Sequence, residues 1–213
     1  MTQRPNLLAG EKLPPPPRQA RSLAKRARLK DAALAVFAKK GYEAASIEEI
    51  AGRAGVAIGG FYQHYQSKRQ LLLALMDELL EGLSRLNLRP QVKGNIRTGM
   101  RELLSAAFAR DLRYLGAYRA WQEAALSDGS LARKQQKIHA WTTARVRAVL
   151  ELLGRLPGAR PNVDIDGLAQ ALDSFFWSLL AQAVHLSKPG LDRQVDAATH
   201  LMYHAMFMDA RDV

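Results

Sequence analysis

The sequence predicts an all-α fold of about nine helices, and two observations carry that prediction. Apolar residues recur at spacings of three and four along most of the chain, while no segment shows the strict alternation of a half-buried strand. The helical runs are interrupted at glycine and proline clusters, among them 127–130 and 157–161. Hydrophobic residues make up 48% of the 213 positions and charged residues 24%, a balance typical of folded chains.

The order of these segments predicts three parts. Residues 1–20 form an arm, residues 21–70 a small three-helix domain, and residues 71–213 a larger helical domain. Four consecutive prolines at 14–17 lie among basic residues of the arm and favour an extended, mobile segment.

Positive charge is concentrated at the N-terminal end of the chain. The formal net charge is +11, and residues 1–70 contain 13 Lys and Arg against 5 Asp and Glu. Such a region attracts polyanions and releases counterions when it binds phosphates. Because a solvated basic face would explain charge alone, a nucleic-acid partner needs a motif in the same region.

A helix-turn-helix motif lies within this basic region. A first amphipathic helix begins near Arg21 and ends at Gly41, a left-handed cap. Ser46 and Glu49 have the spacing of a capping box, which begins a second short helix. Gly55 permits the positive φ of a tight turn, and a third helix follows within a few residues. This arrangement is typical of a motif whose second helix enters the major groove of DNA.

Residues 25–75 also resemble a known family in the order and spacing of their landmarks. The similar positions are the run 32–37, Gly41-Tyr42-Glu43, the run 46–51, Ala54-Gly55-Val56, Gly59, Tyr62, Tyr65, Ser67-Lys68 and Leu71-Leu72. At these positions the sequence closely resembles the N-terminal domain of TetR-type repressors. The resemblance implies a dimeric repressor in which residues 71–213 bind an effector and form the dimer.

The resemblance assigns DNA contacts to the third helix, about 58–64, and its flanks. Tyr62, His64 and Lys68 would meet phosphates, Gln63 would pair with adenine through its amide, and Ile58 would touch a thymine methyl. The full expected DNA-binding set is Ser46, Ala57, Ile58, Gly59, Gly60, Tyr62, Gln63, His64 and Lys68. Tyr62 and Tyr65 also fit an interpretation as packed aromatics, which is preferred for Tyr65.

Two positions depart from the family pattern. Ala57 stands where a serine often caps the third helix, and Gly60 stands where a small branched or hydroxylated residue is common. Each change costs about 1 kcal/mol of helix stability. We therefore expect a soft recognition helix, with part of the specificity left to DNA shape or to the basic arm.

After a fourth helix from Lys68 to about Leu86, five more are expected in the C-terminal domain. Their approximate spans are Val92–Asp111, Leu112–Ser127, Leu131–Leu156, Asp164–Ser187 and Leu191–Asp209. By the resemblance, the last two helices pair with their copies in a homodimer, which implies a palindromic operator.

Aromatic residues in these helices predict an apolar or aromatic effector, although aromatics at helical spacing are more often plain core. The expected ligand-binding set, taken from helices that surround a cavity in the family, is Met100, Phe108, Tyr118, Trp121, Gln122, His139, Trp141, Phe175 and Trp177.

Other features argue against membrane, metal and thiol chemistry. The chain has no cysteine and no secretory apolar segment, and its most apolar stretch, 175–186, is too short to span a bilayer. We therefore expect a cytoplasmic protein without a membrane partner. His200 and His204 have the i,i+4 spacing of metal ligands, but position 201 is Leu, so the metalloprotease signature is absent. Neither a metal nor a cofactor is expected.

The predicted function is a ligand-responsive transcription repressor, not an enzyme, which binds double-stranded DNA as a homodimer and leaves it when a small effector binds. A constitutive or architectural DNA-binding protein without effector is the first alternative. An enzyme with a site in the helical core is the second, although the sequence contains no phosphate loop and no nucleophile elbow.

Overall fold

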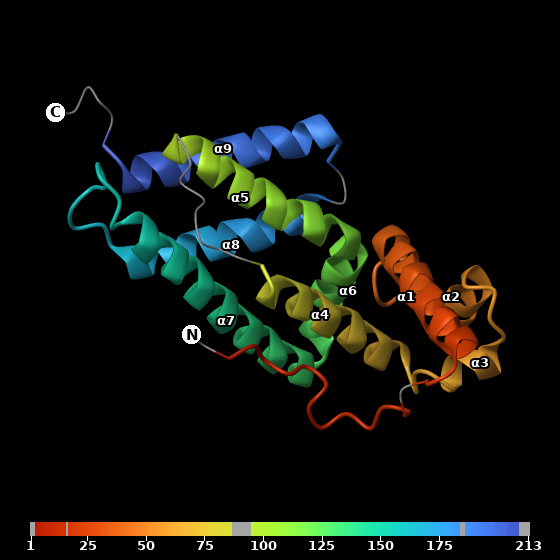
Figure 1. The fold of residues 1–213 in the computed structure, drawn as a ribbon. Coiled ribbons are helices and arrows are strands. Elements are labelled where there is room, and N and C mark those ends of the chain that lie inside the picture. Colours follow the sequence, from red (N-terminus) through yellow and green to blue (C-terminus); the bar gives the residue numbers. More distant parts are fainter. Residues whose placement is uncertain (1–2, 16, 87–94, 184–185, 209–213) are drawn as a thin grey trace. The chain divides into compact units, whose positions relative to one another are not determined.

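A computed structural model describes residues 3–15, 17–86, 95–183 and 186–208, and the side chains of 107–111 lie outside the described set. Over these ranges all regular structure is helical, apart from one isolated antiparallel bridge between Ala159 and Phe207. Nine α-helices and one short 3-10 helix follow one another along the described chain (Figure 1). The predicted all-α fold is confirmed.

The helices divide between two compact units. In chain order they are α1 (Ala20–Lys40), α2 (Ile47–Arg53), α3 (Ile58–Tyr62), α4 (Lys68–Ser84), α5 (Ile96–Asp111), η1 (Leu112–Tyr114), α6 (Leu115–Ser127), α7 (Gly129–Leu153), α8 (Ile165–Ala183) and α9 (Lys188–Met206). The first unit comprises 5–84 and 113–135, and the second unit comprises 1–4, 85–112 and 136–213. The first unit therefore contains the predicted helix-turn-helix segment, 21–70, and adds α4, α6 and the start of α7.

In the first unit, α6 packs directly against α1. A side chain at Gly116 of α6 would collide with the backbone carbonyl of Leu34 in α1, so a glycine is required at this crossing. Arg119, one turn further along α6, donates to the carbonyl oxygen of Ala38 at 2.7 Å and so satisfies the C-terminal end of α1. The first helix is thus held by a helix that lies far from it in the sequence.

The predicted turn signals around α2 are confirmed in part. Gly41 and Gly55 have the positive φ values of +80° and +60° that glycine adopts readily, but Gly41, with ψ −167°, lies outside the left-handed helical region predicted for it. The Ser46 hydroxyl accepts the Glu49 amide at 3.1 Å, which is the first half of the predicted capping box. The Glu49 carboxylate instead pairs with Lys40 at 2.7 Å, so the reciprocal half of the box is not formed.

Part of the N-terminal arm, for which its composition predicted an extended and mobile segment, packs against the first unit. Leu7 is buried against the first unit, with 1% of its surface exposed. Its amide donates to Asp77 of α4 at 3.1 Å, and its carbonyl oxygen accepts from Lys134 of α7 at 2.6 Å. One buried leucine with a satisfied backbone is enough to fix a segment that a compositional argument treats as free.

The second unit has its own apolar core. Within this unit, α5 packs alongside α9 (Figure 1). The buried residues of this core are Met100, Val149, Leu150, Leu153, Ala169, Met202, Met206 and Phe207. They come from α5, α7, α8 and α9 and from the residue that follows α9. No helix among the described residues is both long and apolar enough to cross a membrane.

The last helix begins three residues earlier than the sequence predicted. The expected span Leu191–Asp209 left Lys188-Pro189-Gly190 outside the helix, but α9 starts at Lys188 with Ser187 as its N-cap. The Ser187 hydroxyl accepts the amide of Gly190 at 3.3 Å. Proline is tolerated in the first turn of a helix because the amide it lacks would have no intrahelical partner there.

Candidate nucleic-acid interface

The third helix, α3, has one outward face and one buried residue. Ile58 and Tyr62 are 47% and 49% exposed, whereas Phe61 is fully buried. Gln63, the C-cap residue that follows Tyr62, is also exposed. An aliphatic group, a phenol and an amide therefore face solvent together from a single helical turn and its end.

The buried side of α3 is fixed by aromatic contacts. The Phe61 ring lies 6.0 Å from that of Tyr65, measured between centroids, and Tyr65 is fully buried. The Tyr65 hydroxyl accepts a hydrogen bond from Nε of Arg26 in α1 at 3.2 Å. The interpretation of Tyr65 as a packed aromatic is confirmed, and this ring ties the end of α3 to α1.

The two departures from the family pattern have different structural meanings. Ala57 is the N-cap of α3 and makes no side-chain cap hydrogen bond, as the sequence predicted. A Cβ on Gly60 would lie 2.7 Å from Cγ1 of Val56, so the glycine lets α3 approach that side chain closely. Gly59, in contrast, is exposed and has open space around it. Gly60 therefore answers a packing requirement that its helix propensity did not reveal.

Lys68, at the start of α4, is turned into the protein. Its ammonium donates to the carbonyl oxygens of Tyr42, Glu43 and Ala45 at 2.7, 3.1 and 2.9 Å. It also lies 4.5 Å from the centre of the Tyr42 ring. Three carbonyls match the three donors of an ammonium, so this group holds the turn between α1 and α2 in the structure.

His64 is buried just beyond α3. Only 5% of its surface is exposed, and its Nε2 has no hydrogen-bond partner among the described residues. Burial, together with the positive charges of Arg26 and Lys25, lowers the pKa of the imidazole below its ordinary value. The structure therefore places a neutral, enclosed ring where the resemblance implied a phosphate contact.

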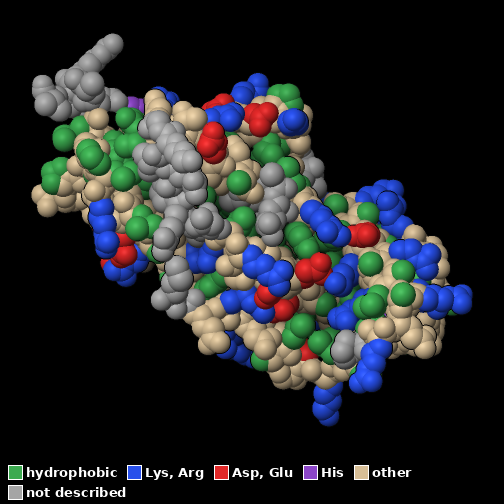
Figure 2. Space-filling view, viewed as in Figure 1, with side chains coloured by type: hydrophobic (Ala, Val, Ile, Leu, Met, Phe, Trp, Pro, Cys, Tyr) green, Lys and Arg blue, Asp and Glu red, His purple; other side chains and the backbone are tan. Residues whose placement is uncertain are grey.

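Basic side chains surround the helix-turn-helix, and sequence reasoning did not assign them individually. Figure 2 shows Lys and Arg side chains gathered over the region of α1 to α3. Arg21, Arg28 and Arg53 are exposed, and the Arg28 guanidinium lies beside the turn at Gly55. Ser46, also exposed, is engaged as the α2 cap. Their charge was the available signal, but only the folded helices show which basic residues lie near α2 and α3.

The predicted ligand-binding residues fall into both units. Tyr118 and Trp121 are buried in α6 of the first unit, where Gln122 is half-buried. In the second unit Met100, Trp141 and Trp177 are buried, while His139 and Phe175 are half-buried. The side chain of Phe108 lies outside the described residues. Trp121 has an indole N–H without a hydrogen-bond partner among the described groups.

Two of these residues meet in a polar cluster between α7 and α8. The ring of His139 lies 4.7 Å from that of Trp177, and its Nδ1 is 3.0 Å from the carboxylate of Asp173. The Trp177 indole donates to the Thr142 hydroxyl at 3.5 Å. Sequence reasoning missed Asp173 and Thr142. The available signal was Asp173, a charged residue within the apolar helix α8. The structure shows that its side chain is only 4% exposed, and a buried carboxylate needs polar partners.

The histidine pair of α9 lies together on the helix surface. The ring centroids of His200 and His204 are 4.2 Å apart, and Nδ1 of His200 is 3.0 Å from the Arg97 guanidinium. Within the described ranges no group of three or more His, Cys, Asp or Glu side chains is arranged to hold a metal ion.

The helix-turn-helix region of this chain is similar to known regulatory proteins. The family model for bacterial regulatory proteins of the tetR family matches residues 29–75, which run from within α1 to within α4. The transcriptional activator FasR of Mycolicibacterium smegmatis is 44% identical over 59 residues, which are 28% of this chain and 27% of that protein. The chain thus matches about a quarter of the length of this curated relative.

Solved structures match over a much larger share of the chain. A γ-butyrolactone receptor described as ArpA-like covers 90% of this chain and 92% of its own, with a TM-score of 0.71 and 19% identity. The structure of SmeT in complex with triclosan covers 88% of this chain and 93% of the SmeT chain, with a TM-score of 0.67 and 22% sequence identity. At these identities the likeness shows that the whole helical fold is shared.

Proposed function

We propose that the chain is a member of the TetR family of transcriptional regulators, whose family model matches residues 29–75, and that it is a ligand-responsive repressor. It binds a palindromic operator as a homodimer in the cytoplasm, and a small apolar or aromatic effector releases it. The family consists of transcriptional regulators rather than enzymes.

The observation that carries the proposal is the outward face of α3. Ile58, Tyr62 and Gln63 are exposed on an element whose buried side is anchored by Phe61. A phenol can donate to a phosphate, an amide can pair with adenine, and an aliphatic group can contact a thymine methyl. Gln63 reads the bases and Tyr62 fixes the register on the backbone. Exposed arginines around the motif supply the sequence-independent attraction.

The proposal does not include His64 and Lys68 as phosphate ligands. His64 is enclosed, and the Lys68 ammonium is occupied by three carbonyl oxygens. Both residues support the DNA-binding surface from inside.

Regulation by an effector rests on two supports. SmeT, which shares this fold, is known in complex with triclosan, and buried aromatic side chains occur in both units of this chain. Release follows if the effector binds better to a form whose recognition helices do not fit the groove, because only differential affinity shifts a population. The relative FasR is a transcriptional activator, so repression, as opposed to activation, is itself part of what we propose for this chain.

A gel-shift comparison of two neighbouring substitutions tests the DNA-binding face. Tyr62→Ala should weaken binding to a selected genomic fragment and to random duplex alike, whereas Gln63→Ala should lower only the preference for the selected fragment, by about 1–3 kcal/mol. Leu126→Ala is the control, because Leu126 is 90% exposed at the end of α6. Unchanged binding by both α3 variants would contradict the proposal.

Two further measurements test the assembly and its regulation. Light scattering should give a dimer at micromolar concentration, and a stable monomer would contradict the palindromic operator. Titration of apolar aromatic compounds into the protein–DNA complex should identify at least one that releases the DNA. A complex that forms but resists every such compound would favour the constitutive DNA-binding alternative.

A further inference from the structure

The first turn of α4 is a junction at which three consecutive side chains bind other parts of the first unit. Lys68 holds the turn between α1 and α2 through backbone carbonyls. Arg69 and Gln70 contact the N-terminal arm. Because only four residues separate the end of α3 from Ser67, the placement of this turn also places α3.

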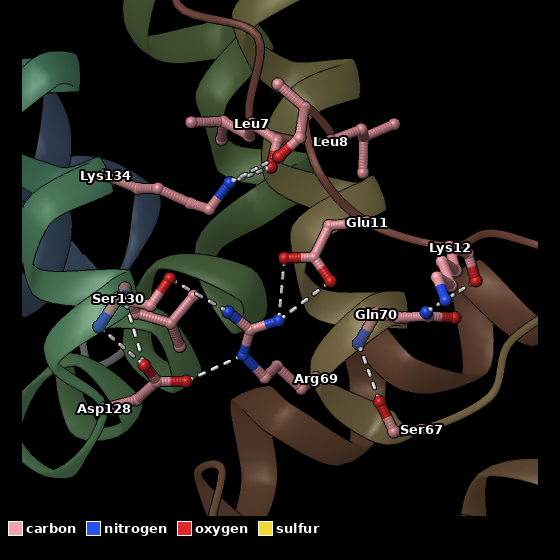
Figure 3. A network of polar contacts seen from close by, with 12 residues as sticks. Leu7, Leu8, Glu11, Lys12, Ser67, Arg69, Gln70, Asp128, Ser130 and Lys134 are labelled. Carbon is pink, nitrogen blue, oxygen red and sulfur yellow. Dashed lines mark hydrogen bonds and ion pairs between the residues drawn. The ribbon is translucent and has the colours of Figure 1, made fainter.

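Arg69 is the centre of this junction (Figure 3). Its Nη1 donates to both carboxylate oxygens of Glu11, at 2.9 and 3.0 Å. Its Nε donates to Asp128 at 2.7 Å and its Nη2 to the Ser130 hydroxyl at 3.3 Å. One guanidinium therefore joins α4 both to the arm and to the junction between α6 and α7.

The electrostatics of the junction favour a fixed arrangement. Burial opposes the charged guanidinium, but hydrogen bonds to Asp128 and Glu11 hold the pKa of Arg69 above its ordinary value. Burial likewise opposes the Asp128 carboxylate, but hydrogen bonds from Arg69 and from the backbone of Leu131 and Ser130 lower its pKa. Charge-assisted hydrogen bonds of this kind are stronger than those between neutral groups.

The arm is fastened at both ends of the segment that crosses this junction. Leu7 is buried, and its backbone is bound by Asp77 of α4 and Lys134 of α7. Further along, the Gln70 side chain donates to the carbonyl oxygen of Lys12 at 3.1 Å. The segment thus bridges α4 and the first turns of α7 over its whole length, as Figure 3 shows for the labelled residues.

We propose that residues 5–13 are a strap that, through Glu11 and Arg69, fixes the first turn of α4 to the α6–α7 junction and so sets the position of α3 for DNA. Glu11 and Arg69 are positioning residues and touch no DNA. The DNA part of this inference rests on the function proposed above, whereas the bridging itself does not. Because α7 supplies residues to both units, the strap ties the recognition helix to the helix that continues into the second unit.

Glu11→Gln is the central variant, because it keeps the side-chain shape and removes the negative charge from the ion pair with Arg69. Glu151→Gln is the matched control, since it removes one charge from an exposed pair with Arg147 in the second unit. We expect Glu11→Gln to raise amide hydrogen exchange about tenfold over residues 6–13, 69–72 and 128–134. Exchange in α8 and α9 should be unchanged, and the control should leave the first unit unchanged.

A double-variant cycle tests the node itself. Asp128→Asn should raise exchange in the same three segments, and combining it with Glu11→Gln should give less than the product of the two effects, because both act through Arg69. Independent effects would overturn the role of Arg69 as the link. Faster amide hydrogen exchange confined to residues 6–13 would overturn the proposed strap, because the arm would then lie on the helices without holding them.

Binding to the selected DNA fragment provides the positioning readout. Glu11→Gln should weaken binding several-fold with an unchanged dependence on salt, because the number of phosphate contacts stays the same. Glu11→Asp should recover part of the affinity. Altered exchange with unaltered DNA affinity would overturn the positioning claim. If the unmodified protein binds no DNA, the proposed function fails, while the exchange experiments still decide whether residues 5–13 bridge the helices.

Discussion

The two short helices of the DNA-binding motif are stabilised in different ways. α2 has a serine cap, two glutamates in its first turn and an ion pair between Glu49 and Lys40. α3 has five residues, no side-chain cap and no acidic residue in its first turn. Carboxylates near a helix N-terminus are stabilising, so α2 has local support that α3 lacks.

The comparison shows that the helix proposed to read DNA is positioned by the tertiary structure. Phe61 and Tyr65 hold α3 from inside, and Gly60 lets it lie against Val56. The exposed residues of α3 are therefore not needed to hold the helix in place and are available for contacts with DNA.

Removal of the aromatic anchor should have the largest effect. Phe61→Ala should lower the free energy of unfolding by about 3–5 kcal/mol, because it empties a fully buried ring position. Chemical denaturation at fixed protein concentration measures this change. Ile58→Ala, on the exposed side of the same helix, is the control and should change stability by no more than about 0.5 kcal/mol.

Loss of the α2 cap should have a moderate effect. Ser46→Ala removes the acceptor for the Glu49 amide and should cost about 1 kcal/mol. Faster amide exchange at the start of α2, with no change inside α4, would accompany the loss. Equal destabilisation by Ser46→Ala and Ala57→Gly would contradict the contrast between a capped and an uncapped helix.

Adding a cap to α3 should have a smaller effect of opposite sign. Ala57 already has the extended backbone of an N-cap residue, with φ −61° and ψ 151°. Ala57→Ser should therefore slow amide exchange within 58–62 and stabilise the protein by up to about 1 kcal/mol. Should the substitution leave exchange in α3 unaltered, the absent cap would not be what limits this helix.

The smallest expected effect is a pH dependence from His64. Because burial lowers the pKa of the folded imidazole below the unfolded value of 6.5, the unfolded chain binds more protons in the interval between the two values. The contribution of His64 to stability is therefore fully present above pH 6.5 and is lost as the pH falls through that interval. His64→Gln should flatten this part of the stability curve, and parallel curves for the two proteins would refute the assignment.

Much of the architecture was predictable because its signals are local. Gly41, Ser46 and Gly55 mark the ends of α1 and α2 correctly, since caps and positive φ depend on a few adjacent residues. The outward position of Tyr62 and Gln63 followed from the resemblance and agrees with their exposure. Their contact with DNA stays a prediction.

The roles of other residues depended on partners distant in the sequence. Lys68 looked like a phosphate ligand, but its ammonium is bound to three carbonyls more than 20 residues away. Gly60 looked like a weakness and proves to be a steric requirement of Val56. The arm was predicted to be mobile by its composition, whereas in the structure Leu7 is buried and Glu11 pairs with Arg69.

The helical class, the turns of the motif and the concentration of charge could be predicted, because periodicity, capping and net charge are properties of neighbouring residues. Which polar groups face solvent and which are used within the protein emerged only from the folded structure. That choice depends on burial and on pairing across the chain, and a buried charge or amide takes whichever partner the fold brings within reach.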